Sequence, residues 1–213
     1  IMARMDEEAM ADDALDAREA VAQLSLLSEN PQLARFVAAR AALVGTALAP
    51  PYLVLLASGE NAARQLGALV LASSLASFVS SFLWGRLSDR SSRQVLIGAG
   101  LAGAAALGLA LFVDAAGLSS TAWAIPLVLF GLMIAYHGVR QARSTYLVDM
   151  APSESRAAYT AVSNTAVGVF LLIAGAGAAG LAALSVPLAL GVFVVMCLAG
   201  TWLAAGLEEV EHG

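Results

Sequence analysis

The sequence contains a single cysteine, Cys197, and no lysine, so that all eleven basic residues among its 213 are arginines. One cysteine allows neither an internal disulfide nor a cysteine-rich zinc site. Charged residues make up only 13 % of the chain, about half their share in soluble domains, which is too little to cover a water-soluble particle. The same scarcity excludes intrinsic disorder, which requires many charges. The net charge of −5 gives no support to nucleic-acid binding, which needs a basic surface.

Hydrophobic residues make up 60 % of the chain, its mean hydropathy is +0.80, and both values predict an integral membrane protein. A helix needs about 20 mainly apolar residues to cross a bilayer. Six stretches are long enough, and none alternates as the strands of an outer-membrane barrel do. The predicted fold class is therefore all-α, with six transmembrane helices in one bundle. The stretches are approximately 37–58, 66–84, 95–113, 122–139 or beyond, 158–181 and 186–207.

The arginines divide unevenly between the two faces that these helices define. With the N-terminus inside, ten lie on or near the cytoplasmic side and only Arg64 lies outside. Cytoplasmic loops are enriched in basic residues, so we expect a multi-pass inner (plasma) membrane protein with both termini in the cytoplasm. Trp84 and Trp202 are then expected at the inner membrane interface and Trp123 at the outer one. The ten arginines are Arg4, Arg18, Arg35, Arg40, Arg86, Arg90, Arg93, Arg140, Arg143 and Arg156.

Residues 1–30 differ in composition from the rest of the chain. Seven acidic side chains lie between residues 6 and 19, among alanines, and this pattern favours a cytoplasmic linker with a weakly amphipathic helix over a signal peptide. The six-helix bundle is expected to occupy 31–213, because Asn30-Pro31 combines a preferred N-cap residue with proline at the first helical position. The first residue is isoleucine rather than methionine, which is compatible with a piece of a longer protein.

The connection between the second and third stretches reads Gly85-Arg86-Leu87-Ser88-Asp89-Arg90-Ser91-Ser92-Arg93-Gln94. It resembles the loop G-x-L-x-D-R-x-G-R-K of the major facilitator superfamily, with Ser92 in place of the second glycine and Gln94 in place of the last basic residue. Residues 149–156, with Asp149, Pro152 and Arg156, are similar to the D-x-x-P-x-x-x-R stretch of the same superfamily.

The resemblance implies the C-terminal six-helix half of a twelve-helix secondary transporter, which moves a small solute by alternating access and is not an enzyme. The implied partners are the lipid bilayer, an N-terminal six-helix half in the same chain or in a second subunit, and an unknown solute, with a proton as the candidate coupling ion. A non-transporting membrane scaffold or accessory subunit is the alternative function.

The resemblance also implies a conformational latch that stabilises one of the two access states. A carboxylate among arginines favours charge-assisted hydrogen bonds, and Asp89 can also accept from free N–H groups at the start of the helix near Arg156, where the helix dipole favours an anion. Alternatively, the loop arginines only set the topology. The latch residues are Gly85, Asp89, Arg90, Arg93, Asp149 and Arg156.

The fourth stretch ends in a group of polar residues. His137, Arg140 and Ser144 recur at spacings that place them on one helix face, with Arg143 close by. If the helix continues to Met150, this face belongs to an aqueous cavity, since ionisable residues inside a membrane are substrate or proton-path candidates. Arginine suits an anionic substrate, and histidine titrates near neutral pH. If the helix ends earlier, the arginines are interfacial residues that extend toward water.

Further polar residues and prolines inside the stretches leave two interpretations each. Ser73 and Ser77 predict either close helix packing or a wall of the cavity, and Asn164 predicts either an interhelical hydrogen bond or a cavity lining. Pro50-Pro51 interrupts the backbone hydrogen bonds of the first stretch and predicts a kink, which is either static or a hinge for gating.

Two segments, 98–103 and 175–180, satisfy the pattern G-x-G-x-x-G. Both lie inside apolar stretches rather than in a strand–turn–helix unit, so neither predicts a nucleotide site. We interpret both as smooth helix faces for close packing. The sequence shows no catalytic triad and no group of metal ligands, and we expect neither an enzyme nor a cofactor.

Overall fold

The computed structural model describes residues 26–57, 62–88 and 90–210, and all regular secondary structure in these residues is helical. Six helical segments are long and apolar enough to cross a membrane, which confirms the predicted fold class. The first is divided into α2 (Pro31–Ala42), α3 (Gly45–Leu48) and α4 (Pro50–Ala57); the others are α5 (Ala62–Ser88), α6 (Ser92–Ala115), α7 (Ala124–Met150), α8 (Arg156–Leu184) and α9 (Val186–Ala205). Of the predicted acidic segment, residues 1–25 lie outside the described residues.

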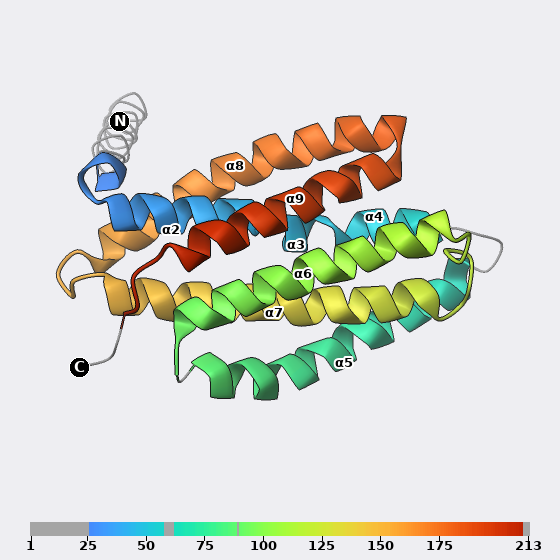
Figure 1. Ribbon diagram of the computed structural model, residues 1–213, viewed down its shortest axis with the longest axis horizontal. Helices are drawn as coiled ribbons and strands as arrows, with labels where there is room; N and C mark the ends of the chain where they lie inside the picture. Colours follow the sequence, from blue (N-terminus) through green and yellow to red (C-terminus); the bar gives the residue numbers. More distant parts are fainter. Residues whose placement is uncertain (1–25, 58–61, 89, 211–213) are drawn as a thin grey trace, which may run out of the picture.

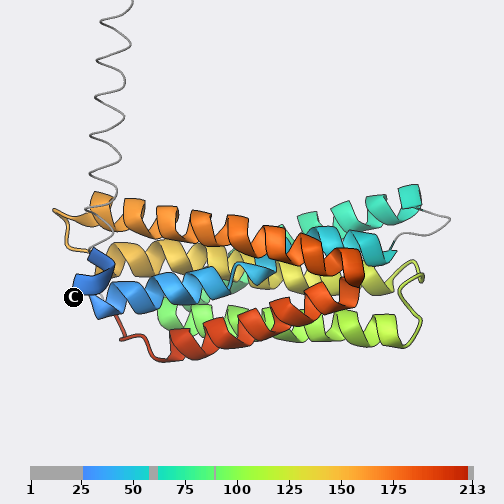
Figure 2. The same cartoon turned by 90° about the horizontal axis from the view of Figure 1, so that it is seen from above.

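The helices run back and forth along one long axis (Figures 1 and 2). The starts of α2, α6 and α8 and the ends of α5, α7 and α9 gather at one end of the bundle, on the left in Figure 1. We name this the arginine end, because Arg35, Arg86, Arg90, Arg93 and Arg156 lie within it or next to it.

A side-chain cap fixes where α2 begins. The Oδ1 atom of Asn30 accepts hydrogen bonds from the backbone N–H groups of Gln32 and Leu33, both at 3.0 Å, and Pro31 is the first residue of α2. This confirms the helix start predicted from Asn30-Pro31. The Nδ2 atom of Asn30 also donates to the Tyr159 hydroxyl at 3.0 Å, so the cap residue connects α2 to α8.

The first span is interrupted next to the prolines, as predicted, and a second time closer to its start. A helical break at Leu43–Val44 precedes α3, and a second bend at Ala49 precedes Pro50. Around the first break the backbone forms tighter hydrogen bonds to the third preceding residue, including Val44 N–H to Ala41 O at 3.2 Å. Gly45 passes close to α9, where a Cβ atom would lie 3.3 Å from the Phe193 carbonyl oxygen. Gly45, which directly follows the first break, therefore packs closely against α9.

Close packing around α6 uses one of the two glycine-rich segments. A Cβ atom on Gly103 would lie 2.8 Å from Thr46 Cγ2, and one on Gly100 would collide with the Thr201 hydroxyl, which confirms the packing interpretation for residues 98–103. For residues 175–180 the described chain bears out the packing interpretation only in part: Ala178 is 3 % exposed, and a Cβ atom on Gly175 would lie 3.9 Å from Leu48 Cδ2. A Cβ atom on Gly177 or Gly180 would meet no heavy atom within 4 Å, because α8 lies at the outer edge of the bundle.

Trp84, which was expected at the inner membrane interface, lies close to the end of α5 but faces the interior of the bundle. Its side chain is only 5 % exposed, and its indole N–H donates to the Ile134 carbonyl at 2.8 Å. The ring lies against Gly138, where a Cβ atom would be 2.6 Å from Trp84 Cε2. Trp123 and Trp202 are exposed, at 63 % and 76 %, as an interfacial location requires. Trp84 is instead a packing residue that joins α5 to α7.

Candidate functional site

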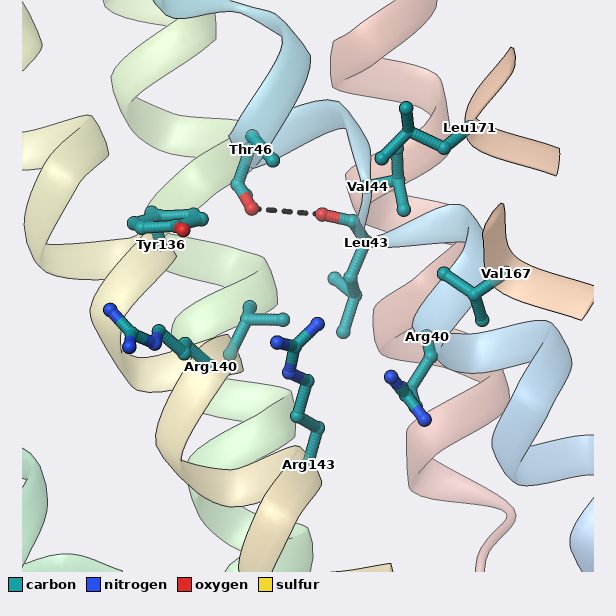
Figure 3. A pocket seen from close by; sticks show the side chains of 11 residues that line it. Arg40, Leu43, Val44, Thr46, Tyr136, Arg140, Arg143, Val167 and Leu171 are labelled. Atoms are coloured by element: carbon teal, nitrogen blue, oxygen red, sulfur yellow. Dashed lines mark hydrogen bonds between the residues drawn. The ribbon is translucent and has the colours of Figure 1, made fainter. Parts of the chain in front are cut away.

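A pocket of about 170 Å³ lies between the broken first span, α7 and α8. Figure 3 shows three arginine side chains around it, Arg40 from α2 and Arg140 and Arg143 from α7. We name it the arginine pocket. Its other lining residues are mainly apolar: Leu43, Val44, Thr46, Ala47, Tyr136, Val139, Val167 and Leu171.

The three arginines lie well inside the membrane spans rather than at their ends, although Arg40 is in the last turn of α2. At 1.5 Å per residue, Arg40 is about 14 Å from the start of α2, and Arg140 and Arg143 are about 15 Å and 10 Å from the end of α7. The helix α7 does continue to Met150, which was the condition for placing Arg140 on a cavity. The antiparallel directions of α2 and α7 bring Arg40 and Arg140 to similar depths from the arginine end.

Arg40 is the buried member of the group, with 5 % of its surface exposed. One terminal nitrogen donates to the Ser163 hydroxyl, and the other donates to Asn164 Oδ1 at 3.1 Å. The guanidinium carbon lies 5.6 Å from the centre of the Phe36 ring, and the buried Nε atom has no hydrogen-bond partner among the described residues. These contacts hold the guanidinium in place, but none of them neutralises its charge.

Arg140 and Arg143 are exposed side chains on the opposite wall. Among the described residues, neither guanidinium has a hydrogen-bond or ion-pair partner, and the salt bridge that the structure does contain joins Arg93 to Glu209. The charge of Arg143 also repels that of Arg40. The pocket therefore concentrates positive charge that the surrounding side chains leave uncompensated.

The face of α7 that lines the pocket is shifted by one residue from the polar face predicted from His137, Arg140 and Ser144. The residues that line the pocket are Tyr136, Val139, Arg140 and Arg143, so Arg140 belongs to both the predicted and the observed face. His137 is half-buried and does not line the pocket; its ring lies edge-on to Tyr136, with centroids 5.3 Å apart.

The other polar candidates fall into two groups. Asn164 is an exposed residue of α8 that contributes to the site through its hydrogen bond with Arg40. Ser73 and Ser77 lie on α5 and do not line the pocket. Pro50 and Pro51 begin α4, four residues beyond Thr46, which does line the pocket. Any bend at these prolines is therefore adjacent to the pocket wall.

The residues of the predicted latch lie at the arginine end, although Asp89 is outside the described residues. Arg93 donates to Glu209 Oε2 at 3.2 Å and to the Ala205 carbonyl at 3.0 Å, so its contacts are with the end of α9 and with the C-terminal segment, residues 206–210. Gly85 lies within α5, Arg90 follows that helix, Asp149 lies in the last turn of α7 and Arg156 begins α8.

The segment after α9 forms contacts that sequence reasoning did not anticipate. The Tyr146 hydroxyl donates to the Glu208 carbonyl at 2.9 Å and accepts from Gln32 Nε2 at 2.6 Å. Arg35 donates to the Gly206 carbonyl at 2.5 Å. The C-terminal segment thus joins α2, α6 and α7 at the arginine end, and no local motif in the sequence indicates these backbone contacts.

A second hollow, of about 580 Å³, lies over α8 and α9 and differs from the arginine pocket in chemistry. Its lining contains no polar side chain, so it has no group to orient a polar solute. Among the described residues, no three histidine, cysteine or acidic side chains are close enough to hold a metal ion. The lining residues of the second hollow are Ala42, Phe170, Pro187, Leu188, Gly191, Val192, Val195, Met196 and Ala199.

Six apolar helices, with a charged pocket between three of the spans, define a polytopic helical membrane protein. The family model of the Major Facilitator Superfamily matches residues 36–212, and the chain belongs to this superfamily. Its members are membrane transporters and typically are not enzymes. No curated protein and no solved structure gives a significant match.

Proposed function

We propose that this chain is the C-terminal six-helix half of a secondary transporter that moves a small solute across the inner membrane by alternating access. Both termini lie in the cytoplasm in this proposal, because the arginine end carries the basic residues that favour the cytoplasmic side. The superfamily match, the facilitator-like loop at 85–94 and the acidic segment before α2 support the assignment.

The observation that carries the proposal is the arginine pocket. Ionisable side chains inside a membrane are costly and usually line a pathway or pair with other groups. Arg140 and Arg143 have no such pair among the described residues, and they face a hollow rather than another helix. A scaffold subunit has no use for unpaired charges within its helices, whereas a transporter uses them to hold a solute.

A second six-helix half completes the pathway in this proposal. Transporter sites lie between two repeats that move relative to each other, and the present helices provide one wall. The outer helices α5 and α8 leave large apolar side chains exposed, including Phe78, Phe82 and Leu172, which suit contact with lipid or with the second half. That half is in the same chain or in a separate subunit.

Gating is proposed to involve the break at the prolines of the first span and the arginine end. Pro50 and Pro51 provide the hinge next to the pocket. The latch of Gly85, Asp89, Arg90, Arg93, Asp149 and Arg156 stabilises one access state, and His137 and Asn164 are candidates for a proton path with Ser73 and Ser77. The latch and hinge roles come from the superfamily resemblance, and the proton-path candidates are polar side chains within the membrane spans.

Reconstitution into liposomes tests the proposed function. The full-length gene product is expected to move at least one member of a panel of benzoate, inorganic phosphate, glucose and lysine, measured by stopped-flow or radiotracer flux. The isolated 213-residue chain is expected to give no flux above that of empty liposomes, because it lacks the opposing wall. Flux through the isolated chain as a monomer would contradict the two-half mechanism.

A further inference from the structure

We propose that the arginine pocket binds a small organic oxyanion, with a carboxylate or phosphate group on an apolar body, as the transported solute. This inference rests on the proposed function and specifies its substrate class. Arg40, Arg140 and Arg143 surround the pocket, and none of its lining residues is acidic. The ligand itself must therefore supply the negative charge.

The arrangement of the three guanidinium groups suits an oxyanion in particular. Arg40 is fixed by Ser163, Asn164 and the face of Phe36, so little conformational freedom is lost when it binds. Its buried Nε–H has no partner among the described residues. Arginine presents parallel N–H groups that match the two oxygens of a carboxylate or phosphate. Arg140 and Arg143 are exposed and unpaired, and can approach from the opposite wall.

The rest of the pocket argues against other classes of solute. A sugar or polyol needs several acceptors as well as donors, but the side-chain acceptors in the lining are limited to the hydroxyls of Thr46, which donates to the Leu43 carbonyl at 2.8 Å, and Tyr136, and no carboxylate or amide lines the pocket. A cation would be repelled by all three arginines. Val139, Val167 and Leu171 instead provide apolar contact. The volume of about 170 Å³ is below the ~300 Å³ of drug-sized sites, which favours a small solute.

The phosphate of a lipid headgroup shares the chemistry of a soluble oxyanion and must be distinguished from it. We test the soluble source with three probes of matched shape, benzoate, benzamide and benzylamine, which are anionic, neutral and cationic, and with inorganic phosphate. Binding is measured by calorimetry on the full-length protein in nanodiscs of phosphatidylcholine alone, and again in nanodiscs that also contain phosphatidylglycerol.

Benzoate or phosphate is expected to bind in phosphatidylcholine nanodiscs, whereas benzamide and benzylamine are not. Arg40→Gln and Arg143→Gln are each expected to weaken anion binding at least tenfold, and Arg40→Lys is expected to weaken it because lysine lacks the planar pair of donors. Arg143→Gln changes an exposed side chain and keeps the test valid if Arg40→Gln does not fold. Arg86→Gln, which removes an equal charge outside the pocket, is the matched control and is expected to bind the anion normally.

Three results with the soluble probes would overturn the inference: no binding of either anion by the folded protein, equal binding of benzoate and benzamide, or equal loss of binding in Arg86→Gln. Arginine-dependent stabilisation by phosphatidylglycerol without any effect of the soluble anions would identify a lipid site and also overturn the inference.

Flux of glucose or lysine without anion binding would reject the oxyanion as the solute but would leave the proposed transport function intact. Arginine-dependent anion binding without flux in the reconstituted full-length protein would support the site and reject transport.

Discussion

Replacing Gly200 by leucine is expected to lower the apparent melting temperature of the purified protein by several degrees. A Cβ atom at this position would lie 2.7 Å from Leu43 Cγ and 3.2 Å from the Ala39 carbonyl oxygen, so α9 could no longer approach α2. Overpacking of this kind costs about 3 kcal/mol, which corresponds to about 6–12 °C at ~2–4 °C per kcal/mol. Since Ala39 and Leu43 flank Arg40, anion binding is expected to weaken as well.

Gly191→Leu is the matched control for Gly200→Leu. Both glycines lie in α9, but a Cβ atom on Gly191 would meet no heavy atom within 4 Å. Leucine there is expected to leave the melting temperature unchanged or to raise it slightly, because glycine is a poor helix former. Equal destabilisation by the two substitutions, measured by thermal unfolding in detergent, would show that contact between α2 and α9 is not what limits the side chain at Gly200.

Trp84→Ala is expected to destabilise the bundle by about 3–5 kcal/mol, the usual cost of removing a buried large aromatic side chain. The substitution removes the ring that fills the space over Gly138 and the N–H donor to the Ile134 carbonyl. Both partners lie on α7, just before Arg140. The loss of stability should therefore be accompanied by a loss of solute binding, since α7 positions two of the three arginines.

Two further substitutions separate the contributions of Trp84. Trp84→Phe retains much of the apolar volume but loses the N–H group, and is expected to cost only about 1 kcal/mol for the hydrogen bond in addition to a smaller cavity. Trp202→Ala changes a side chain that is 76 % exposed and should leave the melting temperature nearly unchanged. A larger effect at Trp202 than at Trp84, in the same thermal assay, would contradict the packing role of Trp84.

The features that sequence predicted best depend on local chemistry along one helix. Asn30 and Pro31 begin α2 as predicted because capping requires only residues within one turn. The six spans depend on the length and apolar content of each stretch and could be predicted for the same reason. The close approach at Gly100 and Gly103 also followed from a run of small residues on one helix.

The features that sequence missed depend on how one helix faces another. Arg40 was counted among the topology-setting arginines, although its place nine residues after Pro31 already put it about 14 Å along the helix. Its burial requires Ser163 and Asn164 of α8, and helix periodicity does not encode that pairing. The same reason explains the one-residue rotation of the polar face on α7 and the burial of Trp84, whose position depends on the gap at Gly138.

We propose that water reaches the arginine pocket but does not reach the rest of the outer surface of α8. Leu171 and Leu172 are neighbours on α8, exposed at 38 % and 71 %, but only Leu171 lines the pocket. We predict that a charged, membrane-impermeant maleimide labels Leu171→Cys and not Leu172→Cys in the full-length protein in liposomes; the native Cys197 is fully buried and should stay unlabelled. Benzoate is expected to slow the labelling. Equal labelling of the two cysteines, or labelling of Leu172→Cys alone, would contradict the claim.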